Sequence, residues 1–234
     1  YAYHRPITCP SHGLEVDDSA VGGAVLEVKE PVLPRPGLDP GALVRSVHTR
    51  AALSEHDPLD RLKGMVGICL YPDKAFFEMK VQIYNRTPFV QTFLWWVNVG
   101  VHVHDAYQVV FPQDVDVVTD HSKRSMSSYP IARGTYYGID YGPETDISWY
   151  KNVPVSTSYF AYESSFDFFG GYDHRADAGI INVANHHISP GKKMFTWGTG
   201  ESAKGWEGLL TDADGPYIEL MAGVYTDNQP DFSW

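Results

Sequence analysis

Most of the chain from Met65 onward consists of short segments in which apolar and polar residues alternate, separated by turn-forming residues such as Pro72-Asp73. Successive side chains of a strand point to opposite faces, so this alternation indicates strands with one buried face. Short connections between many short strands favour an antiparallel sandwich over a parallel sheet. The predicted strands span 65–71, 75–84, 90–103, 106–111, 134–141, 159–163, 179–185, 193–198 and 217–223.

The segment before Met65 has a different pattern. Apolar residues at near-helical spacing lie between Leu43 and Leu53, and Asp57-Pro58 interrupts them, which predicts one or two short helices near residues 41–63. We therefore expect one mainly β domain over 1–234, with a loop-rich and helical lead-in over 1–64 and the main β-sandwich over 65–234. Because the sequence starts at Tyr1 rather than at a methionine, we expect a fragment of a longer chain.

The charge and composition exclude several classes of partner and site. The formal net charge is -11, whereas binding to a nucleic acid backbone requires clustered Lys and Arg. The longest apolar runs, such as 93–97, are far shorter than the roughly 20 residues of a membrane span. Cys9 and Cys69 are too far apart in the sequence to indicate a zinc or redox motif. We expect neither a nucleic acid nor a membrane partner.

Aromatic residues lie next to polar ones between Trp95 and Tyr141. Sugars bind to such mixtures, because their hydroxyls need paired donors and acceptors while an apolar ring face stacks on Trp or Tyr. The candidates from this region are Trp95, Trp96, Asn98, His121, Asp140 and Tyr141. Trp95 and Trp96 have an alternative role as core residues, and at most one of them faces a given pocket, since neighbours on a strand point apart.

A second group of polar and aromatic residues spans 167–187 and supplies Tyr172 and His186 as candidates. The adjacent His186 and His187 cannot both point inward from a strand, and no third ligand stands at a recognised zinc spacing. We expect no cofactor and no metal among the site residues, although an oxygen-rich structural Ca²⁺ site stays open.

The third group surrounds Glu219. Asp214-Gly215-Pro216 predicts a turn and 217–220 the strand that leaves it, so Glu219 lies on the face opposite Ile218 and Leu220. If that face lines a pocket, Glu219 is the best carboxylate for general acid–base catalysis; if it faces solvent, Glu219 is an ordinary surface acid. Further candidates for substrate binding are Glu163, Trp197, Asp227 and Gln229.

An ordered series of motifs resembles one family, the uncharacterised domain found ahead of tetratricopeptide repeats in large bacterial and fungal proteins. The resemblance covers roughly residues 65–234. It rests on Asn85-Arg86-Thr87-Pro88, Trp95-Trp96-Val97-Asn98, Phe111-Pro112, Asp120-His121, Ser158-Tyr159, Gly170-Gly171-Tyr172-Asp173-His174, Lys193-Met194-Phe195-Thr196-Trp197-Gly198 and Gly215-Pro216-Tyr217-Ile218-Glu219-Leu220. It implies a galactose mutarotase-like supersandwich, a mono- or oligosaccharide ligand, and a tetratricopeptide-repeat region that follows in the same chain.

Three functions follow from this resemblance. The first is a glycoside hydrolase, which needs two carboxylates, here Glu219 with Asp140, or with Asp227 or Glu163 in its place. The second is an aldose epimerase, in which Glu219 is the base and His121 the acid, with His186 as a second candidate acid. The third is a carbohydrate-binding domain without catalysis. A shared fold permits all three.

Overall fold

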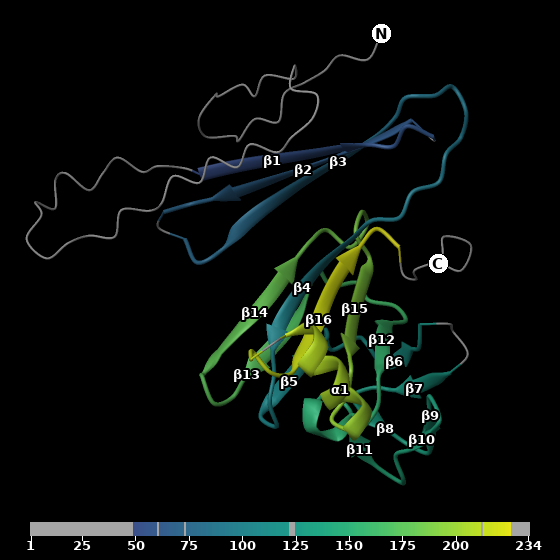
Figure 1. Cartoon of the computed structure of the whole chain (residues 1–234). Coiled ribbons are helices and arrows are strands. Elements are labelled where there is room, and N and C mark those ends of the chain that lie inside the picture. The colour runs from purple at the N-terminus through teal and green to yellow at the C-terminus, as the bar shows by residue number, and fades with distance from the viewer. Residues whose placement is uncertain (1–48, 60, 73, 122–124, 212, 226–234) are drawn as a thin grey trace, which may run out of the picture. The chain divides into compact units, whose positions relative to one another are not determined.

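The computed structural model describes residues 49–59, 61–72, 74–121, 125–211 and 213–225 (Figure 1). Contacts between Cα atoms divide the chain into two units, Tyr1–Gln91 and Thr92–Trp234. Antiparallel strands dominate the described residues of both units, as the sequence predicted. No helix of the described residues is both long and apolar enough to cross a membrane. The expectation of a single domain over 1–234 stays a prediction.

The described part of the first unit is a three-stranded antiparallel sheet. Its strands are β1 (Thr49–His56), β2 (Leu62–Leu70) and β3 (Phe77–Asn85), and β2 is central. β1 pairs with β2 from Thr49–Leu70 to His56–Lys63, and β2 pairs with β3 over its whole length.

The helical prediction for residues 41–63 is wrong wherever the structure describes them. Residues 49–56 form β1, and β2 begins at Leu62. Residues 41–48 lie outside the described residues. The apolar spacing is compatible with a helix, but the backbone of β1 forms its hydrogen bonds with β2 along all of its length. Pairing with a neighbouring strand therefore decides the structure here, and local periodicity does not reveal that pairing.

The second unit is built on a six-stranded antiparallel sheet of order β4-β16-β15-β12-β6-β7. Strand β16 (Tyr217–Gly223), next to the edge strand, pairs with β4 on one side and β15 on the other. The remaining strands are β4 (Trp96–His102), β6 (Val117–Thr119), β7 (Met126–Ser128), β12 (Thr157–Ala161) and β15 (Gly191–Thr196).

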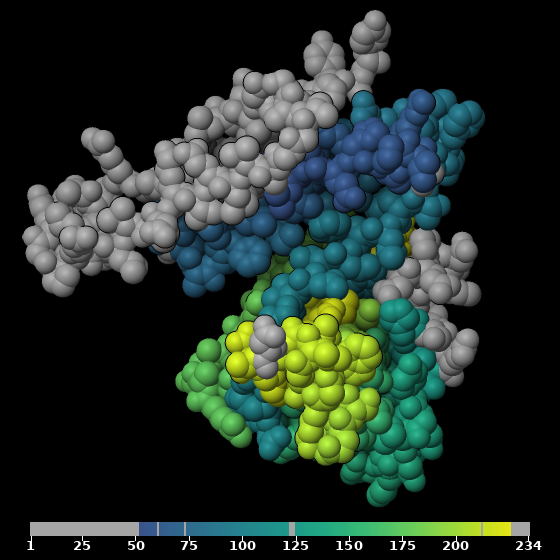
Figure 2. Space-filling model, viewed as in Figure 1, coloured from purple at the N-terminus to yellow at the C-terminus, as the bar shows by residue number. Residues whose placement is uncertain are grey.

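A three-stranded sheet of order β14-β13-β5 forms the second layer of this unit. Its strands are β5 (Tyr107–Val110), β13 (Phe168–Asp173) and β14 (Ala178–Val183). Short ladders join β9 (Thr135–Tyr136) to β10 (Ile139–Asp140), and β8 (Ile131–Ala132) to β11 (Thr145–Asp146). The described helices are a 3-10 turn, η2 (Tyr150–Asn152), and α1 (Glu201–Leu210), which lies on the surface in Figure 2.

The core of the second unit lies between these two sheets. Ile218, Leu220 and Met194 come from the larger sheet, Val109 and Phe169 from the smaller one, and each is at most 5 % exposed. All five belong to one cluster of buried residues. Two antiparallel layers that enclose a common core have the β-sandwich-like architecture that the sequence predicted.

Candidate functional site

The core-facing residues of the six-stranded sheet determine which side chains lie on its other face. Ile218 and Leu220 are buried in the core, so Glu219 between them points away from it. Cross-strand partners share a face, and Glu219 pairs with Gly100 of β4 and Phe195 of β15. We call this side the outer face. Its described residues include Trp96, Asn98, Gly100, Phe160, Lys193, Phe195 and Glu219.

Glu219 is half-buried on the outer face and is joined to Asn98. The Nδ2 of Asn98 donates a hydrogen bond of 3.1 Å to Oε2 of Glu219. Directly opposite Glu219 on β4 stands Gly100, where a Cβ would meet no heavy atom closer than 4.0 Å. The missing side chain leaves room beside the carboxylate, so a ligand group has space to approach Glu219.

Lys193 lies on the same face, diagonally from Glu219. It pairs with Met221, two positions along β16 from Glu219. Such diagonal positions lie about 7–8 Å apart, so the two side chains are neighbours on this face. Lys193 is 4 % exposed, and its Nζ lies 4.6 Å from the ring centroid of Phe160 and 5.9 Å from that of Trp96. Aromatic faces attract the ammonium and hold it in place.

His121 lies at the end of β6 and extends this cluster. Its Nδ1 is 3.4 Å from Nζ of Lys193, and its ring centroid is 5.8 Å from that of Phe160. The His121 side chain is exposed, unlike that of Lys193. The imidazole therefore lies between a buried cation and solvent.

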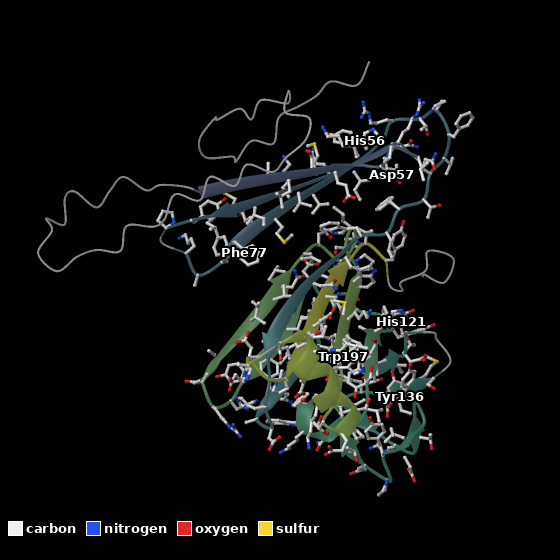
Figure 3. The ribbon with its side chains drawn as sticks, viewed as in Figure 1. His56, Asp57, Phe77, His121, Tyr136 and Trp197 are labelled. Carbon is white, nitrogen blue, oxygen red and sulfur yellow. The ribbon has the colours of Figure 1, made fainter. Side chains whose placement is uncertain are left out.

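Aromatic residues follow β15 to its end, where Figure 3 shows Trp197 beside α1. The Trp197 ring stacks on that of Trp206 with centroids 5.0 Å apart, and Phe195 meets it edge-on at 4.9 Å. Its Nε1 donates a 3.1 Å hydrogen bond to the hydroxyl of Tyr217. Trp206 is 46 % exposed, so this aromatic group offers ring surface to a ligand.

Other sequence candidates lie elsewhere. Asp140 is exposed on β10, where its Oδ1 accepts a 2.9 Å hydrogen bond from the amide of Gly142. The neighbouring Tyr141 is 7 % exposed, and burial raises the pKa of its hydroxyl. Tyr172 of β13 donates from its hydroxyl to Asp177. Trp95 precedes β4, and Asp227 and Gln229 lie outside the described residues.

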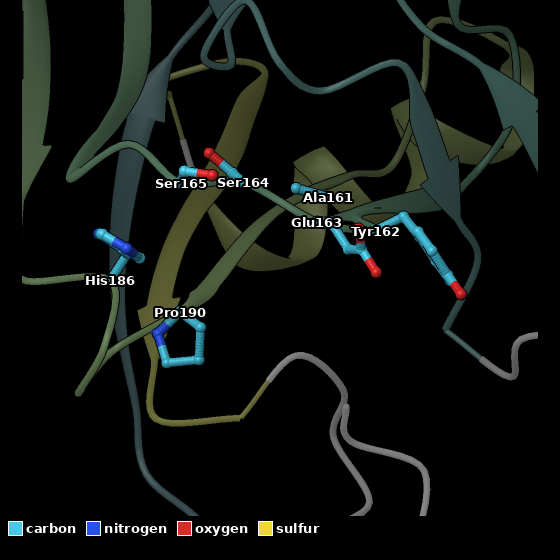
Figure 4. A pocket seen from close by; sticks show the side chains of 7 residues that line it. All are labelled: Ala161, Tyr162, Glu163, Ser164, Ser165, His186 and Pro190. Carbon is cyan, nitrogen blue, oxygen red and sulfur yellow. The ribbon is translucent and has the colours of Figure 1, made fainter.

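Glu163 and His186 both line one hollow. Residues 161–165, His186 and Pro190 line it (Figure 4). The His186 ring and main chain both bind the carboxylate of Asp167. Among the described residues, no group of three or more His, Cys, Asp or Glu side chains is arranged to hold a metal ion.

The structure thus brings five sequence candidates to the outer face or its edge: Trp96, Asn98, His121, Trp197 and Glu219. Sequence reasoning missed Lys193, Phe195 and Trp206. Lys193 and Phe195 lie at alternate positions of a predicted strand, and that spacing was a signal that they share a face. Trp206 follows Ala203 at helical spacing, but Gly205 and Gly208 weakened the helical pattern around it.

The family model described as Domain of unknown function (DUF5107) matches residues 46–233. The chain belongs to this family. The DUF5107 match includes every described strand of both units. This membership agrees with the predicted resemblance to an uncharacterised domain.

A solved structure similar to the DUF5107 chain is the crystal structure of a TPR-domain-containing protein from Parabacteroides distasonis ATCC 8503. The TM-score is 0.59 and the sequence identity 21 %, so the likeness shows a shared fold. It covers 77 % of this chain and 29 % of that chain, so the chain spans less than a third of that protein. The galactose mutarotase-like supersandwich stays a prediction.

Proposed function

We propose that this domain binds a mono- or oligosaccharide on the outer face of its six-stranded sheet. The observation that carries the proposal is the Asn98–Glu219 pair, which lies beside the open position at Gly100 and on the same face as the half-buried ring of Phe195. A carboxylate accepts hydrogen bonds from sugar hydroxyls, and an amide both donates and accepts them. The ring surfaces of Phe195 and Trp197 suit the apolar face of a sugar.

Carbohydrate binding is better supported than glycoside hydrolysis. Hydrolysis needs two carboxylates across the scissile bond, roughly 5–9.5 Å apart in the two main classes. Glu219 is the only carboxylate among the described strand residues of the outer face. Asp140, the expected partner of Glu219, lies on β10 in a separate ladder and forms a turn with Gly142.

Epimerisation of an aldose is the second candidate, because His121 and Glu219 flank the cluster around Lys193. In this reaction Glu219 removes the proton from the anomeric hydroxyl while His121 protonates the ring oxygen, and the sugar ring opens and closes again. The expected similarity of this family to galactose mutarotase-like proteins also favours this candidate and implies a supersandwich. The resemblance to the uncharacterised domain family implies that tetratricopeptide repeats follow in the same chain.

The proposal is tested by titrating the 234-residue chain with a panel of monosaccharides and short glycans in a calorimeter. Glu219→Gln keeps an acceptor for Asn98 but loses the charge, so we expect affinity for the bound sugar to fall about tenfold. Glu144→Gln is the matched control, because Glu144 is an exposed carboxylate paired with Arg133. No binding by any sugar of the panel, or equal affinity of the two variants, contradicts the proposal.

A second measurement on the same sugars, the conversion of one anomer into the other, separates the two candidate functions. An epimerase converts one anomer of the bound sugar into the other, which polarimetry follows directly. His121→Ala then abolishes conversion but leaves binding measurable. If the domain only binds the sugar, neither the unaltered chain nor His121→Ala converts the anomers faster than the spontaneous rate.

A further inference from the structure

The strand β14 lies at an open edge of the smaller sheet. Among the described residues it pairs with β13 alone, and Figure 1 shows it as the outermost strand of that sheet. Proteins commonly protect such an edge with charged residues, proline or a bulge, because unpaired main-chain groups bind other strands. β14 contains no charged residue and no proline, and its register with β13 is continuous. Its edge is therefore open to a further strand.

The printed register and two flanking hydrogen bonds show which main-chain groups point to this edge. The amide of Ala184 donates a 2.8 Å bond to the carbonyl oxygen of Asp167, one step beyond the last pair of β13 and β14. Hydrogen-bonded and non-hydrogen-bonded pairs alternate in an antiparallel ladder. The main-chain groups of Gly179, Ile181 and Val183 therefore point away from β13, toward the open edge.

The other side of β13 agrees with this assignment. There the amide of His174 donates a 3.1 Å bond to the carbonyl oxygen of Ala106, one step beyond the pairs of β13 with β5. By the same alternation, Gly170 and Tyr172 bond β5, whereas Phe169 and Gly171 bond β14. The partners of Phe169 and Gly171 on β14 are Asn182 and Ile180, which are not among the three residues at the open edge.

These three residues also lie on an exposed apolar face. Ile180 packs against the core, so Ile181 and Val183 on either side of it point away from the core. Ile181 is 63 % exposed and Val183 is 70 % exposed. The half-buried Phe168 lies opposite Val183 on β13 and shares this face with it. Apolar side chains gathered on a surface are typical of an interaction site.

The sequence of β14 is complementary to itself in an antiparallel pair. A twofold axis through Ile181 places this residue opposite Ile181 of a second copy, and Gly179 opposite Val183 of that copy. Each of these residues then exchanges both main-chain hydrogen bonds with its opposite. Opposite residues share a face, so the apolar side chains of the two copies lie together.

The charges along this pair favour a second copy as the partner. The strand carries no charge, so self-pairing brings no like charges together at its centre. Asp177, which precedes the strand, falls next to Asn185 of the second copy, and His186 and His187 follow Asn185 in the chain. Amide and imidazole N–H groups donate to a carboxylate, so the ends of the pair are complementary as well.

We propose that two copies of this chain associate through β14, which pairs with β14 of the second copy in antiparallel orientation. The two smaller sheets then form one continuous sheet across a twofold axis. The interface uses main-chain groups of Gly179, Ile181 and Val183 and the exposed side chains of Ile181 and Val183. It does not rest on sugar binding, because the outer face belongs to the other sheet.

The test combines sedimentation velocity over a range of concentrations with amide hydrogen exchange followed by NMR, both on the 234-residue chain. We expect a reversible equilibrium between monomer and dimer. In the dimer the amides of Gly179, Ile181 and Val183 exchange about tenfold more slowly or less, because they become hydrogen-bonded. The amides of Ile180 and Asn182 bond β13 in the monomer already, so their exchange rates stay the same.

Two variants test the interface without changing the core. Ile181→Lys places two like charges opposite each other and removes buried apolar surface, which raises the dissociation constant of the dimer about tenfold or more. Val183→Pro removes an amide that points to the open edge and no bond with β13, so it also weakens the dimer. Leu209→Lys on α1 is the control, because Leu209 is 76 % exposed outside this sheet, and it leaves the dimer unchanged.

Three results overturn the proposal. The first is a chain that stays monomeric at every concentration, including one whose edge amides are protected only after another protein is added. The second is a dimer in which the amides of Gly179, Ile181 and Val183 gain no protection, since its interface then lies elsewhere. The third is an equal dissociation constant for Ile181→Lys and Leu209→Lys, with both variants folded by their melting temperatures.

Discussion

Asn98 and Glu219 are 121 positions apart in the sequence, and a 3.1 Å hydrogen bond from Nδ2 to Oε2 joins them across β4 and β16. The register of these strands places Gly100, rather than a larger residue, opposite Glu219. One pairing of two strands thus supplies a carboxylate, an amide that holds it and the space in front of it.

Removal of the amide should weaken sugar binding without unfolding the domain. In Asn98→Ala the Glu219 carboxylate loses the hydrogen bond that orients it, which costs about 0.5–1.5 kcal/mol of binding free energy, or roughly twofold to thirteenfold in affinity. Calorimetric titration measures this change. An unchanged affinity with an unchanged melting temperature shows that the pair does not orient the carboxylate for a ligand.

Lys193 should matter for sugar binding, whereas an exposed lysine should not. Lys193→Met keeps a long apolar chain against Phe160 and Trp96 but removes the ammonium whose Nζ lies 3.4 Å from Nδ1 of His121. We expect a loss of affinity of about tenfold. The control is Lys204→Met on α1, where the exposed lysine pairs with Glu201. Equal affinities of the two variants contradict a role for Lys193.

Gly171 should tolerate no side chain, because Tyr107 occupies the space beside it. A Cβ on Gly171 would lie 2.6 Å from Cε1 of Tyr107, which is 2 % exposed. Gly171→Ala therefore destabilises the core by about 1–3 kcal/mol through overpacking. Gly208→Ala is the control, since nothing lies within 4 Å of its Cβ, and in a helix it stabilises by about 0.5–1 kcal/mol. Urea unfolding of the two variants measures both effects.

Alkaline pH should lower the free energy of unfolding at pH values that are too mild to hydrolyse the main chain. Burial, with a smaller contribution from acidic residues, raises the pKa of Tyr107 and of Tyr150 to about 12, against about 10 in an unfolded chain. Between these values the folded protein binds more protons than the unfolded one, so stability falls as pH rises.

Denaturant titrations from pH 9 to 12 follow this loss. Tyr107→Phe removes one ionisable group and also a buried hydroxyl that forms no hydrogen bond with the described residues. We expect a shallower decline of stability with pH in this variant. An identical decline in the two proteins excludes Tyr107 as a cause.

The sequence predicted the strands best where one face of each is buried. The predicted strand 217–223 coincides with β16, and the predicted 193–198 overlaps β15 closely, because both alternate between core and outer face. The placement of Glu219 opposite Ile218 and Leu220 followed from the same alternation. Periodicity of two is a local property, so the sequence alone displays it.

Other features depend on contacts between distant segments. The apolar residues around the start of β1 have near-helical spacing, and only the pairing of β1 with β2 makes this segment a strand. The helix α1 was not predicted, because Gly205 and Gly208 lower its helical propensity, and its Trp206 stacks on Trp197 from β15. The cluster of His121 and Lys193 spans 72 positions. No local pattern shows which distant strands meet.

We propose above all that a sugar binds on the outer face, beside the pair of Glu219 and Asn98. The most direct test is a crystal structure of the chain soaked with the sugar that binds most tightly in the calorimetric panel. We predict sugar density beside Gly100, with hydroxyls in hydrogen-bonding distance of Glu219 and Asn98 and a ring face against Phe195 or Trp197. Sugar bound at another surface, with the outer face empty, contradicts it.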